Sequence, residues 1–242
     1  MIQIKNMFKK FGGVKALDNC SIEIKQSKIT AIIGPNGSGK STLFHIISHL
    51  IEKDSGKIYF NNKQICRLKD YQRAKLGFSR TFQEVRLFKN LTIKEHFEIA
   101  MECEDEKLLH SLFKKKNNHT EKIIECLQFV GLNKPLNTLA SNLSYGQRKL
   151  LDLAVAIAKP HSILFLDEPV AGVNPEIKAQ IKKIISELKQ KGSTIVIIEH
   201  DMNFIMDISD FIYVMDYGKV IAQGLPKEIQ NNKLVLDAYL GE

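Results

Sequence analysis

Eight consecutive residues near the N-terminus have the types and spacing that bind a polyphosphate. They are Gly34, Pro35, Asn36, Gly37, Ser38, Gly39, Lys40 and Ser41, and they fit the pattern Gly-x-x-x-x-Gly-Lys-Ser/Thr of a phosphate-binding loop. Glycines let the backbone curl so that successive N–H groups point inward, and a helix N-terminus adds its positive end. We expect Lys40 to reach the β- and γ-phosphates of a nucleotide and the Ser41 hydroxyl to ligate Mg²⁺.

The segments on either side of this loop have the character that such a loop requires. Residues 29–33 form an apolar, β-branched run typical of a buried strand, and a helix is expected from Thr42 to Ser48, with Thr42 counted among the phosphate contacts. A plain glycine turn between strand and helix is the alternative. The length of the loop, its flanks and the Lys-Ser pair together favour phosphate binding.

Two adjacent carboxylates follow another apolar run. Residues 162–166 predict a central strand of a parallel sheet, and Asp167 and Glu168 come directly after it. In open α/β sheets ligands bind outside the carboxyl ends of the strands, so these carboxylates are expected near the phosphates. Asp167 suits the Mg²⁺ shell, and Glu168 suits a base or an orienter of attacking water. Simple solvation of a strand end is the alternative.

Two more polar residues are expected at the same sheet edge. His200 follows a buried strand at residues 194–198, and Gln83 follows a short strand at residues 77–82. A lone histidine after a strand is often structural, but His200 is expected at the same sheet edge as Gln83, which favours a contact with a γ-phosphate. Asp201 is expected to cap the helix that comes next.

A second candidate for anion binding lies far along the chain. Ser144 is a natural N-cap for a helix that runs through residues 150–158, and Gly146, Gln147, Arg148 and Lys149 follow it closely. A capped helix without further function is the alternative. Near the N-terminus, Phe11 could stack on an adenine ring or belong to the core.

The remaining pattern predicts an α/β fold. Strands are expected at residues 2–4 and 21–24 around Gly12-Gly13, at residues 57–60 before an Asn61-Asn62 turn, and in a hairpin around Tyr217-Gly218. Between residues 84 and 159 helical spacing dominates, with helices at 92–101 and 121–130 and a loop at 114–119. We therefore expect a core of residues 1–85 and 160–242 with a helical insertion at 86–159.

Composition limits the classes of function. The chain has 242 residues and a formal net charge of +8, and its lysines are scattered, which favours general solubility over a nucleic-acid or membrane surface. Its four cysteines form no C-x-x-C pair, so we expect reduced cytosolic thiols and neither zinc nor disulfides. No 18-residue apolar run and no signal-like start appear, so neither a membrane span nor export is expected. The run Lys114–Lys116 is expected to be a solvated loop.

The ordered motifs resemble those of ABC-transporter ATPases along essentially the whole chain. The order is phosphate loop, Gln83, the Leu143–Gln147 signature, Asp167-Glu168, Gly172–Pro175 and His200. Residues 80–88, 171–175, 199–202 and 238–242 resemble more closely the LivG-like ATPase subunits of branched-chain amino acid importers. Tyr145 replaces the first signature glycine and Asn174 the usual aspartate of the D-loop. Both departures occur within that group.

The resemblance implies a P-loop NTPase core with a mostly parallel sheet, an N-terminal antiparallel β subdomain and an inserted α-helical subdomain. It places Gln83 with Ser41 and Asp167 around Mg²⁺. It also implies a head-to-tail dimer in which Ser144, Gly146 and Gln147 of one subunit close over ATP bound by a second ATPase subunit, related or identical.

The same resemblance implies partners at the cytoplasmic face of the inner membrane. These are two membrane permeases and an extracytoplasmic substrate-binding protein, with no nucleic acid. Permease helices are expected to dock on the helical insertion and on the segment after Gln83. Alternatives are an importer of urea or amides, a lipid exporter, a soluble ABC ATPase acting on DNA or ribosomes, and a non-hydrolysing regulator. Glu168 and His200 argue against the regulator, and the lack of a long coiled-coil insertion argues against the soluble class.

Overall fold

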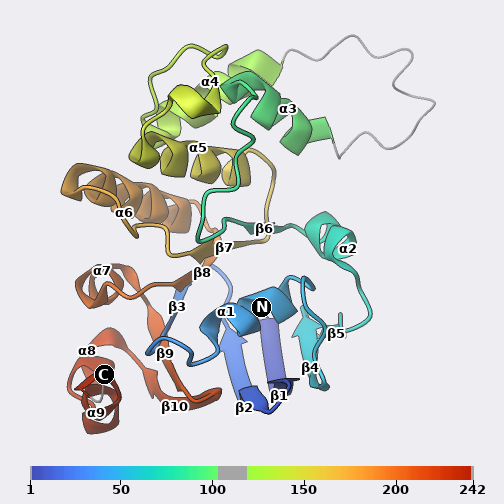
Figure 1. Cartoon of the computed structure of the whole chain (residues 1–242), viewed down its shortest axis with the longest axis vertical. Helices are drawn as coiled ribbons and strands as arrows, with labels where there is room; N and C mark the ends of the chain where they lie inside the picture. Colours follow the sequence, from blue (N-terminus) through green and yellow to red (C-terminus); the bar gives the residue numbers. More distant parts are fainter. Residues whose placement is uncertain (1, 103–118, 241–242) are drawn as a thin grey trace. The chain divides into compact units, whose positions relative to one another are not determined.

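The computed structural model describes residues 2–102 and 119–240, so Cys103, the run Lys114–Lys116 and the last two residues lie outside the described part. The chain forms two compact units (Figure 1). The first unit comprises Met1–Arg80, Ser162–Glu168 and Ser186–Glu242, and the second comprises Thr81–His161 and Pro169–Ile185.

A six-stranded sheet forms the centre of the first unit. Its strand order is β10-β9-β3-β8-β7-β6, and every neighbouring pair is parallel except β9 with β10. The strands are β3 (Ile29–Ile33), β6 (Phe78–Arg80), β7 (Ile163–Asp167), β8 (Thr194–Ile198), β9 (Phe211–Asp216) and β10 (Lys219–Gly224). All residues of β3, β7 and β8 are buried, as their unbroken apolar runs predict. The mostly parallel sheet is thus confirmed.

A four-stranded antiparallel sheet in the same unit has the order β2-β1-β4-β5. Its strands are β1 (Ile2–Phe11), β2 (Val14–Ile24), β4 (Ser55–Phe60) and β5 (Lys63–Gln64). Gly12 and Gly13 connect β1 to β2, and Asn61 and Asn62, with φ of 47° and 65°, form the turn between β4 and β5. The predicted strands and both turns are confirmed.

The core of the first unit packs α1 (Lys40–Ile47) against both sheets. The Phe44 ring meets the ring of Phe165 from β7 edge-on, with centroids 5.3 Å apart, and both side chains are buried. The other helices here are α2 (Asp70–Lys75), α7 (Met202–Ile208), α8 (Pro226–Gln230) and α9 (Lys233–Leu240). Asp201 caps α7 by accepting a 2.9 Å hydrogen bond from the Phe204 N–H, as predicted.

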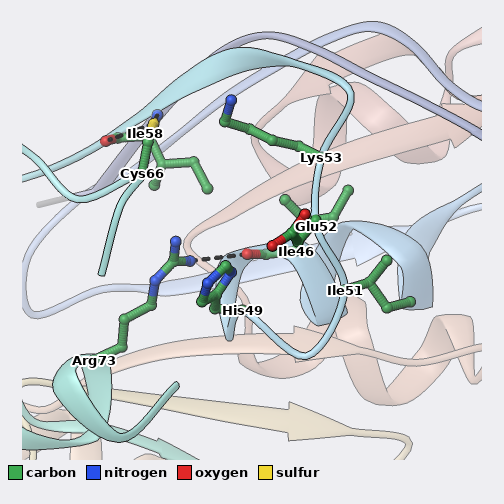
Figure 2. Close-up of a pocket in the computed structure, with 8 residues that line it drawn as sticks. All are labelled: Ile46, His49, Ile51, Glu52, Lys53, Ile58, Cys66 and Arg73. Atoms are coloured by element: carbon green, nitrogen blue, oxygen red, sulfur yellow. Dashed lines mark hydrogen bonds between the residues drawn. The ribbon is translucent and has the colours of Figure 1, made fainter. Parts of the chain in front are cut away.

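A buried arginine holds the C-terminal end of α1. The Arg73 guanidinium donates to the carbonyl of Ile46 at that end of the helix (Figure 2). It also donates to the carbonyls of Ile47, Ile65 and Leu68. Burial lowers the pKa of Arg73 to about 10, so it stays charged at neutral pH. The cation complements the negative end of the helix dipole. The adjoining cavity of about 170 Å³ is lined by Ile46, His49, Ile51, Glu52, Lys53, Ile58, Cys66 and Arg73.

The second unit is helical. It contains α3 (Ile93–Glu102), α4 (His119–Val130), the 3₁₀ turn η1 (Ala140–Asn142), α5 (Tyr145–Ile157) and the first part of α6 (Pro175–Gln190). The helices predicted at 92–101 and 121–130 are confirmed. Among the described residues of this unit, strand pairing is limited to one isolated bridge between Thr92 and Leu139. The unit shares most of its chain with the insertion expected at 86–159, whose boundaries remain a prediction.

Across residues 2–102 and 119–240, the structure contains no helix with the length and apolar character needed to span a bilayer.

Candidate functional site

The phosphate loop connects β3 to α1 through backbone that only glycine adopts easily. Gly34 and Gly39 have φ of 146° and 101°. A Cβ on Gly34 would lie 2.0 Å from the Met215 carbonyl oxygen, and one on Gly39 would lie 2.3 Å from that of Ala16. Gly37, with φ of 77°, has open space around it, so only its conformation requires glycine. The curled loop predicted from the sequence is therefore confirmed.

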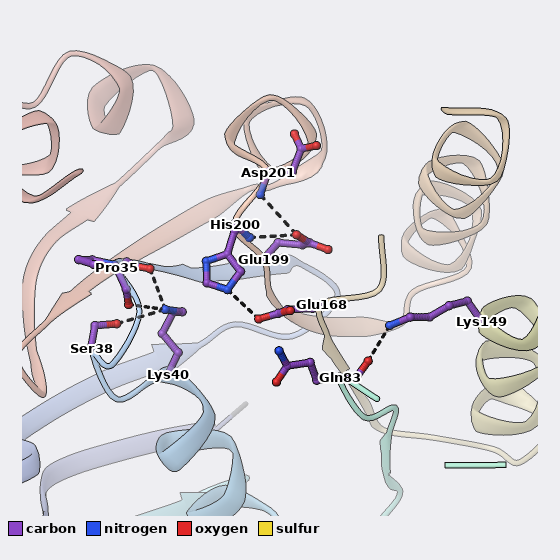
Figure 3. A network of polar contacts seen from close by, with 10 residues as sticks. Pro35, Ser38, Lys40, Gln83, Lys149, Glu168, Glu199, His200 and Asp201 are labelled. Carbon is purple, nitrogen blue, oxygen red and sulfur yellow. Dashed lines mark hydrogen bonds and ion pairs between the residues drawn. The ribbon is translucent and has the colours of Figure 1, made fainter. Parts of the chain in front are cut away.

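Lys40 lies inside this curl. Its Nζ donates to the carbonyls of Gly34 and Pro35, at 2.7 Å each, and to Ser38 Oγ at 3.3 Å (Figure 3). The side chain is buried with 5% exposure, so its positive charge is confined to the loop.

The start of α1 is suited to an anion. Gly39 is the N-cap and has no side chain to cap the first turn, whose N–H groups point out of the helix end. Ser41 and Thr42 lie half-buried in that turn, and Asn36 and Gly37 are exposed at the tip of the loop. The loop therefore presents amides and hydroxyls at the positive end of a helix.

The hairpin between β9 and β10 supports the loop from one side. The Gly218 N–H donates to the Ser38 carbonyl at 3.0 Å, and the Gly218 carbonyl accepts from the Asp18 N–H of β2 at 2.9 Å. The predicted Tyr217-Gly218 turn is confirmed, but its link to the phosphate loop is not visible in the sequence. No local pattern joins residues so far apart in the chain.

Asp167 ends β7 and is almost fully buried. Its Oδ2 forms a 2.8 Å ion pair with Arg80 Nη2, whose residue ends the neighbouring parallel strand β6. Arg80 also lies over the Phe44 ring, 5.6 Å from its centroid. This role of Arg80 is not visible in the sequence. Its signals in the sequence were its place at the end of a short predicted strand and at the start of the LivG-like stretch 80–88.

Glu168 and His200 lie together at the carboxyl ends of β7 and β8. His200 Nε2 and Glu168 Oε1 are 2.7 Å apart (Figure 3). Glu168 has a φ of 48°, and its N–H donates to the Ile198 carbonyl at 2.9 Å, which fixes the residue in this uncommon conformation. A strained, buried carboxylate at a strand end is typical of a functional site.

Glu199 has a structural role that the sequence does not predict. Its buried carboxylate accepts hydrogen bonds from the N–H groups of His200 and Asp201, at 2.9 and 3.4 Å. It thereby shapes the turn that carries His200.

Phe11 is not a core residue. It ends β1 with 47% of its surface exposed, and Lys9 Nζ lies 5.2 Å from its ring centroid. The core alternative is therefore wrong, and stacking on adenine remains a prediction.

The signature segment of the second unit starts α5. Ser144 Oγ accepts from the Gln147 N–H at 3.3 Å, and Gln147 Oε1 accepts from the Ser144 N–H at 3.1 Å, which is a capping box. The predicted N-cap is confirmed. A Cβ on Gly146 would lie 3.0 Å from the Ile177 side chain of α6, so this glycine also permits close helix packing.

The two departures from the general ABC pattern have structural partners in the same unit. The Tyr145 ring lies over Gly172, with a ring carbon 3.3 Å from the place of a Cβ on that glycine. Asn174 Oδ1 accepts from the Ile177 N–H at 2.9 Å and so caps the start of α6.

Lys149 binds the backbone within the second unit. Its side chain is buried with 5% exposure, and its Nζ donates to the Gln83 carbonyl at 2.9 Å. The Gln83 residue itself is exposed. This hydrogen bond could not be predicted from the sequence, because Lys149 and Gln83 belong to different predicted elements.

The residues available for a metal ion fit Mg²⁺ bound together with a nucleotide. In the part of the chain that the structure describes, no group of three or more His, Cys, Asp or Glu side chains could hold a metal. Mg²⁺ prefers oxygen ligands and is often bound through one or two carboxylates plus substrate phosphates. The Asp167 carboxylate and the Ser41 hydroxyl are donors of this kind.

Comparison with known proteins identifies a family. The family described as "ABC transporter" matches residues 17–171, and the one described as "Branched-chain amino acid ATP-binding cassette transporter" matches residues 219–242. The probable branched-chain amino acid transport ATP-binding protein LivG of Archaeoglobus fulgidus is 38% identical over 100% of this chain and 95% of its own.

Solved structures agree with this match. The crystal structure of the ADP conformation of an ATP-binding cassette of an ABC transporter aligns with a TM-score of 0.88 and 36% identity, over 100% of this chain and 99% of that one. A dimeric post-hydrolysis structure of another ATP-binding cassette, bound to ADP and Pi, aligns with a TM-score of 0.82 and 26% identity, over 93% and 99%. With a family match over more than half of its length and a full-length relative, the chain belongs to the ATP-binding cassettes of ABC transporters.

Proposed function

We propose that this protein binds ATP with Mg²⁺, hydrolyses it, and thereby powers the import of branched-chain amino acids through permease subunits. The observation that carries this proposal is the edge of the six-stranded sheet in the first unit. β3, β8 and β7 are neighbouring parallel strands, so the phosphate loop, His200 and the Asp167-Glu168 pair all follow carboxyl ends at one edge.

The chain's own groups account for nucleotide binding. The loop amides and Lys40 hold the phosphates, and the exposed Phe11 ring offers a face for the adenine. Ser41 and Asp167 are the proposed protein ligands of Mg²⁺, which when bound neutralises charge on the β- and γ-phosphate oxygens. Gln83 keeps its proposed place in that shell on the strength of the family resemblance.

Glu168 is the proposed general base, or the group that orients the attacking water. Its carboxylate is buried, and the His200 imidazole fixes one of its oxygens at 2.7 Å. A carboxylate held in this way is oriented before the reaction begins, which lowers the cost of reaching the transition state. His200 is the proposed contact of the γ-phosphate.

The proposed assembly is a head-to-tail pair with a second ATPase subunit, related or identical. Ser144, Gly146 and Gln147 would then face ATP bound by the other subunit. The dimeric cassette bound to ADP and Pi supports this arrangement, because the present chain is similar to it over 93% of its length. The exposed position of Ser144 at the start of α5 is compatible with such a role.

The proposed cargo and location rest on the names of the relatives. The A. fulgidus relative is described as a branched-chain amino acid transport protein, and the family of that name matches residues 219–242 of this chain. We infer two permease subunits, an extracytoplasmic binding protein, and a peripheral position at the cytoplasmic face of the membrane.

Hydrolysis is tested with the purified protein. Glu168→Gln should leave ATP affinity nearly unchanged and lower turnover by about 100-fold or more, because it removes the base. The exposed Glu125 of α4 provides the matched control Glu125→Gln. Near-normal turnover in Glu168→Gln would remove Glu168 from this role.

Cargo is tested by deleting the gene and measuring uptake of labelled leucine, isoleucine and valine, with labelled urea measured in parallel. The proposal expects loss of amino acid uptake that wild-type protein restores and Lys40→Ala does not. Loss of urea uptake alone would assign a different cargo.

A further inference from the structure

Two residues of α5 bind the backbone at Gln83 from one side. Lys149 Nζ donates to the Gln83 carbonyl at 2.9 Å (Figure 3). The Asp152 carboxylate accepts a hydrogen bond from the Phe82 N–H. Lys149 and Asp152 are three positions apart, so they lie on the same face of the helix. They therefore hold both ends of the Phe82-Gln83 dipeptide.

The two side chains that make these hydrogen bonds are shielded from solvent to different degrees. Lys149 is buried, and Asp152 is half-buried. Burial raises the pKa of Asp152 to about 7, against the opposing effects of the Lys149 ammonium and the Phe82 N–H. A buried ammonium or carboxylate without partners is strongly unfavourable. Each group thus depends on the other and on the Phe82-Gln83 backbone.

A further contact involves the Phe82 side chain. The Arg86 guanidinium lies over the Phe82 ring, 4.2 Å from its centroid. The Lys149 and Asp152 hydrogen bonds constrain the main chain at Phe82 and Gln83, and the Arg86 contact adds to the packing of the Phe82 ring, while Gln83 itself is exposed. Such an arrangement sets the direction in which the Gln83 side chain leaves the backbone.

The helix that provides these contacts also carries the signature serine. Ser144 is the N-cap of α5, and Lys149 follows five residues later, roughly 7.5 Å along the helix axis. A single rigid element therefore joins Ser144 to the backbone of Gln83 within the second unit. These two residues belong to different parts of the proposed reaction.

We propose that Lys149 and Asp152 are positioning residues, which fix the main chain at Gln83 relative to the helix that begins with Ser144. Neither residue contacts substrate in this proposal, and both act through Gln83. The expected loss of ATP turnover in variants of Lys149 rests on the proposed ATPase function. The expected loss of backbone order at Gln83 does not depend on that function.

Hydrogen exchange tests the backbone contact without reference to activity. In Lys149→Met and Asp152→Leu, amide exchange in residues 81–84 should accelerate about tenfold or more, since each change removes a hydrogen bond to a charged group. Lys122→Met, at an exposed lysine of α4, is the matched control and should leave this segment unchanged. Unchanged exchange in both α5 variants would overturn the proposal.

Asp152→Asn is the conservative variant. It keeps an oxygen that accepts from the Phe82 N–H, so protection of that amide should stay within about threefold of wild type. If Lys149→Met or Asp152→Leu does not fold, Asp152→Asn still allows the hydrogen-exchange test. Loss of protection in Asp152→Asn with an otherwise intact second unit would contradict the hydrogen bond as the positioning contact.

A double-mutant cycle separates positioning from general stability. Lys149→Met should lower ATP turnover about tenfold with nearly unchanged ATP affinity, and it should cause little further loss in a Gln83→Ala background. Losses that multiply in the double variant would show that Lys149 does not act through Gln83. A wild-type protein without ATPase activity would refute the proposed function, and hydrogen exchange would still decide the positioning.

Discussion

Arg80 and Asp167 form a buried ion pair across the ends of two neighbouring parallel strands, with Arg80 Nη2 2.8 Å from Asp167 Oδ2. Their side chains are 8% and 4% exposed. The pair fixes the carboxylate that we propose as a ligand of Mg²⁺. An arginine is suited to this ion pair because its guanidinium is rigid and permanently charged.

Removing Arg80 should destabilise the fold. Arg80→Met leaves the buried Asp167 carboxylate without the guanidinium, and breaking a buried ion pair typically costs about 3–5 kcal/mol. Urea unfolding measures the change in the free energy of unfolding. Arg67→Met, at an exposed arginine, is the control. The double variant Arg80→Met/Asp167→Asn should recover part of the loss, because it removes the uncompensated charge. An equal, small effect in Arg80→Met and Arg67→Met would contradict this account.

Ser144→Arg should separate nucleotide binding from hydrolysis. Ser144 is exposed and, in the proposed dimer, faces ATP bound by the other subunit, so the isolated subunit should still bind ATP. ATP-dependent dimerisation and turnover should both fail, because a bulky cation replaces the residue proposed to face the other subunit's ATP. Ser141→Arg in η1 is a matched control for an added arginine at an exposed serine.

In a homodimeric preparation, mixing Ser144→Arg with Lys40→Ala subunits should restore part of the turnover, since one mixed site keeps both wild-type halves. Loss of ATP binding by the Ser144→Arg monomer would show that the cross-subunit role is wrong.

Phe88 is a candidate anchor for a permease helix. The structure leaves 62% of this side chain exposed. Its N–H donates to Nε2 of the buried His96 at 3.0 Å, which orders the backbone that presents the ring. An aromatic anchor in a well-packed interface contributes about 2 kcal/mol or more.

Phe88→Asp should therefore release the subunit from permease-containing vesicles, measured by co-sedimentation, while the soluble protein still binds ATP. Leu234→Asp, at a leucine that is 61% exposed in α9, is the control. Unchanged sedimentation of Phe88→Asp would exclude this docking site.

Asp152 should make stability fall as pH rises. Burial raises its pKa from the usual 3.8 to about 7 in the folded protein, so the folded state binds more protons than the unfolded state between these pH values. The wild type should lose up to about 4 kcal/mol of stability relative to Asp152→Asn between pH 4 and pH 7, and the difference should level off above that range. Urea unfolding of both proteins at several pH values measures it. A pH-independent difference would contradict the raised pKa.

Much of the fold follows from local pattern. Residues 29–33, 163–166 and 194–198 are predominantly apolar runs, and such runs are typical of strands buried on both faces of a parallel sheet. The glycines, Lys40 and Ser41 predict a phosphate loop, because that spacing creates inward-pointing amides at a helix start. The Asn61-Asn62 and Tyr217-Gly218 turns follow from residues that tolerate positive φ.

The tertiary structure decided how these parts support one another. The Met215 carbonyl leaves no room for a Cβ at Gly34. Arg80 forms an ion pair with the Asp167 carboxylate, and Lys149 donates a hydrogen bond to the Gln83 carbonyl. Phe11 and Phe88 proved exposed, where sequence position allowed burial. Local sequence determines backbone conformation and hydrophobic period, which depend on near neighbours. The group that pairs with a buried charge, or that leaves room only for a glycine, belongs to a chain segment many residues away. Only folding brings that segment into contact.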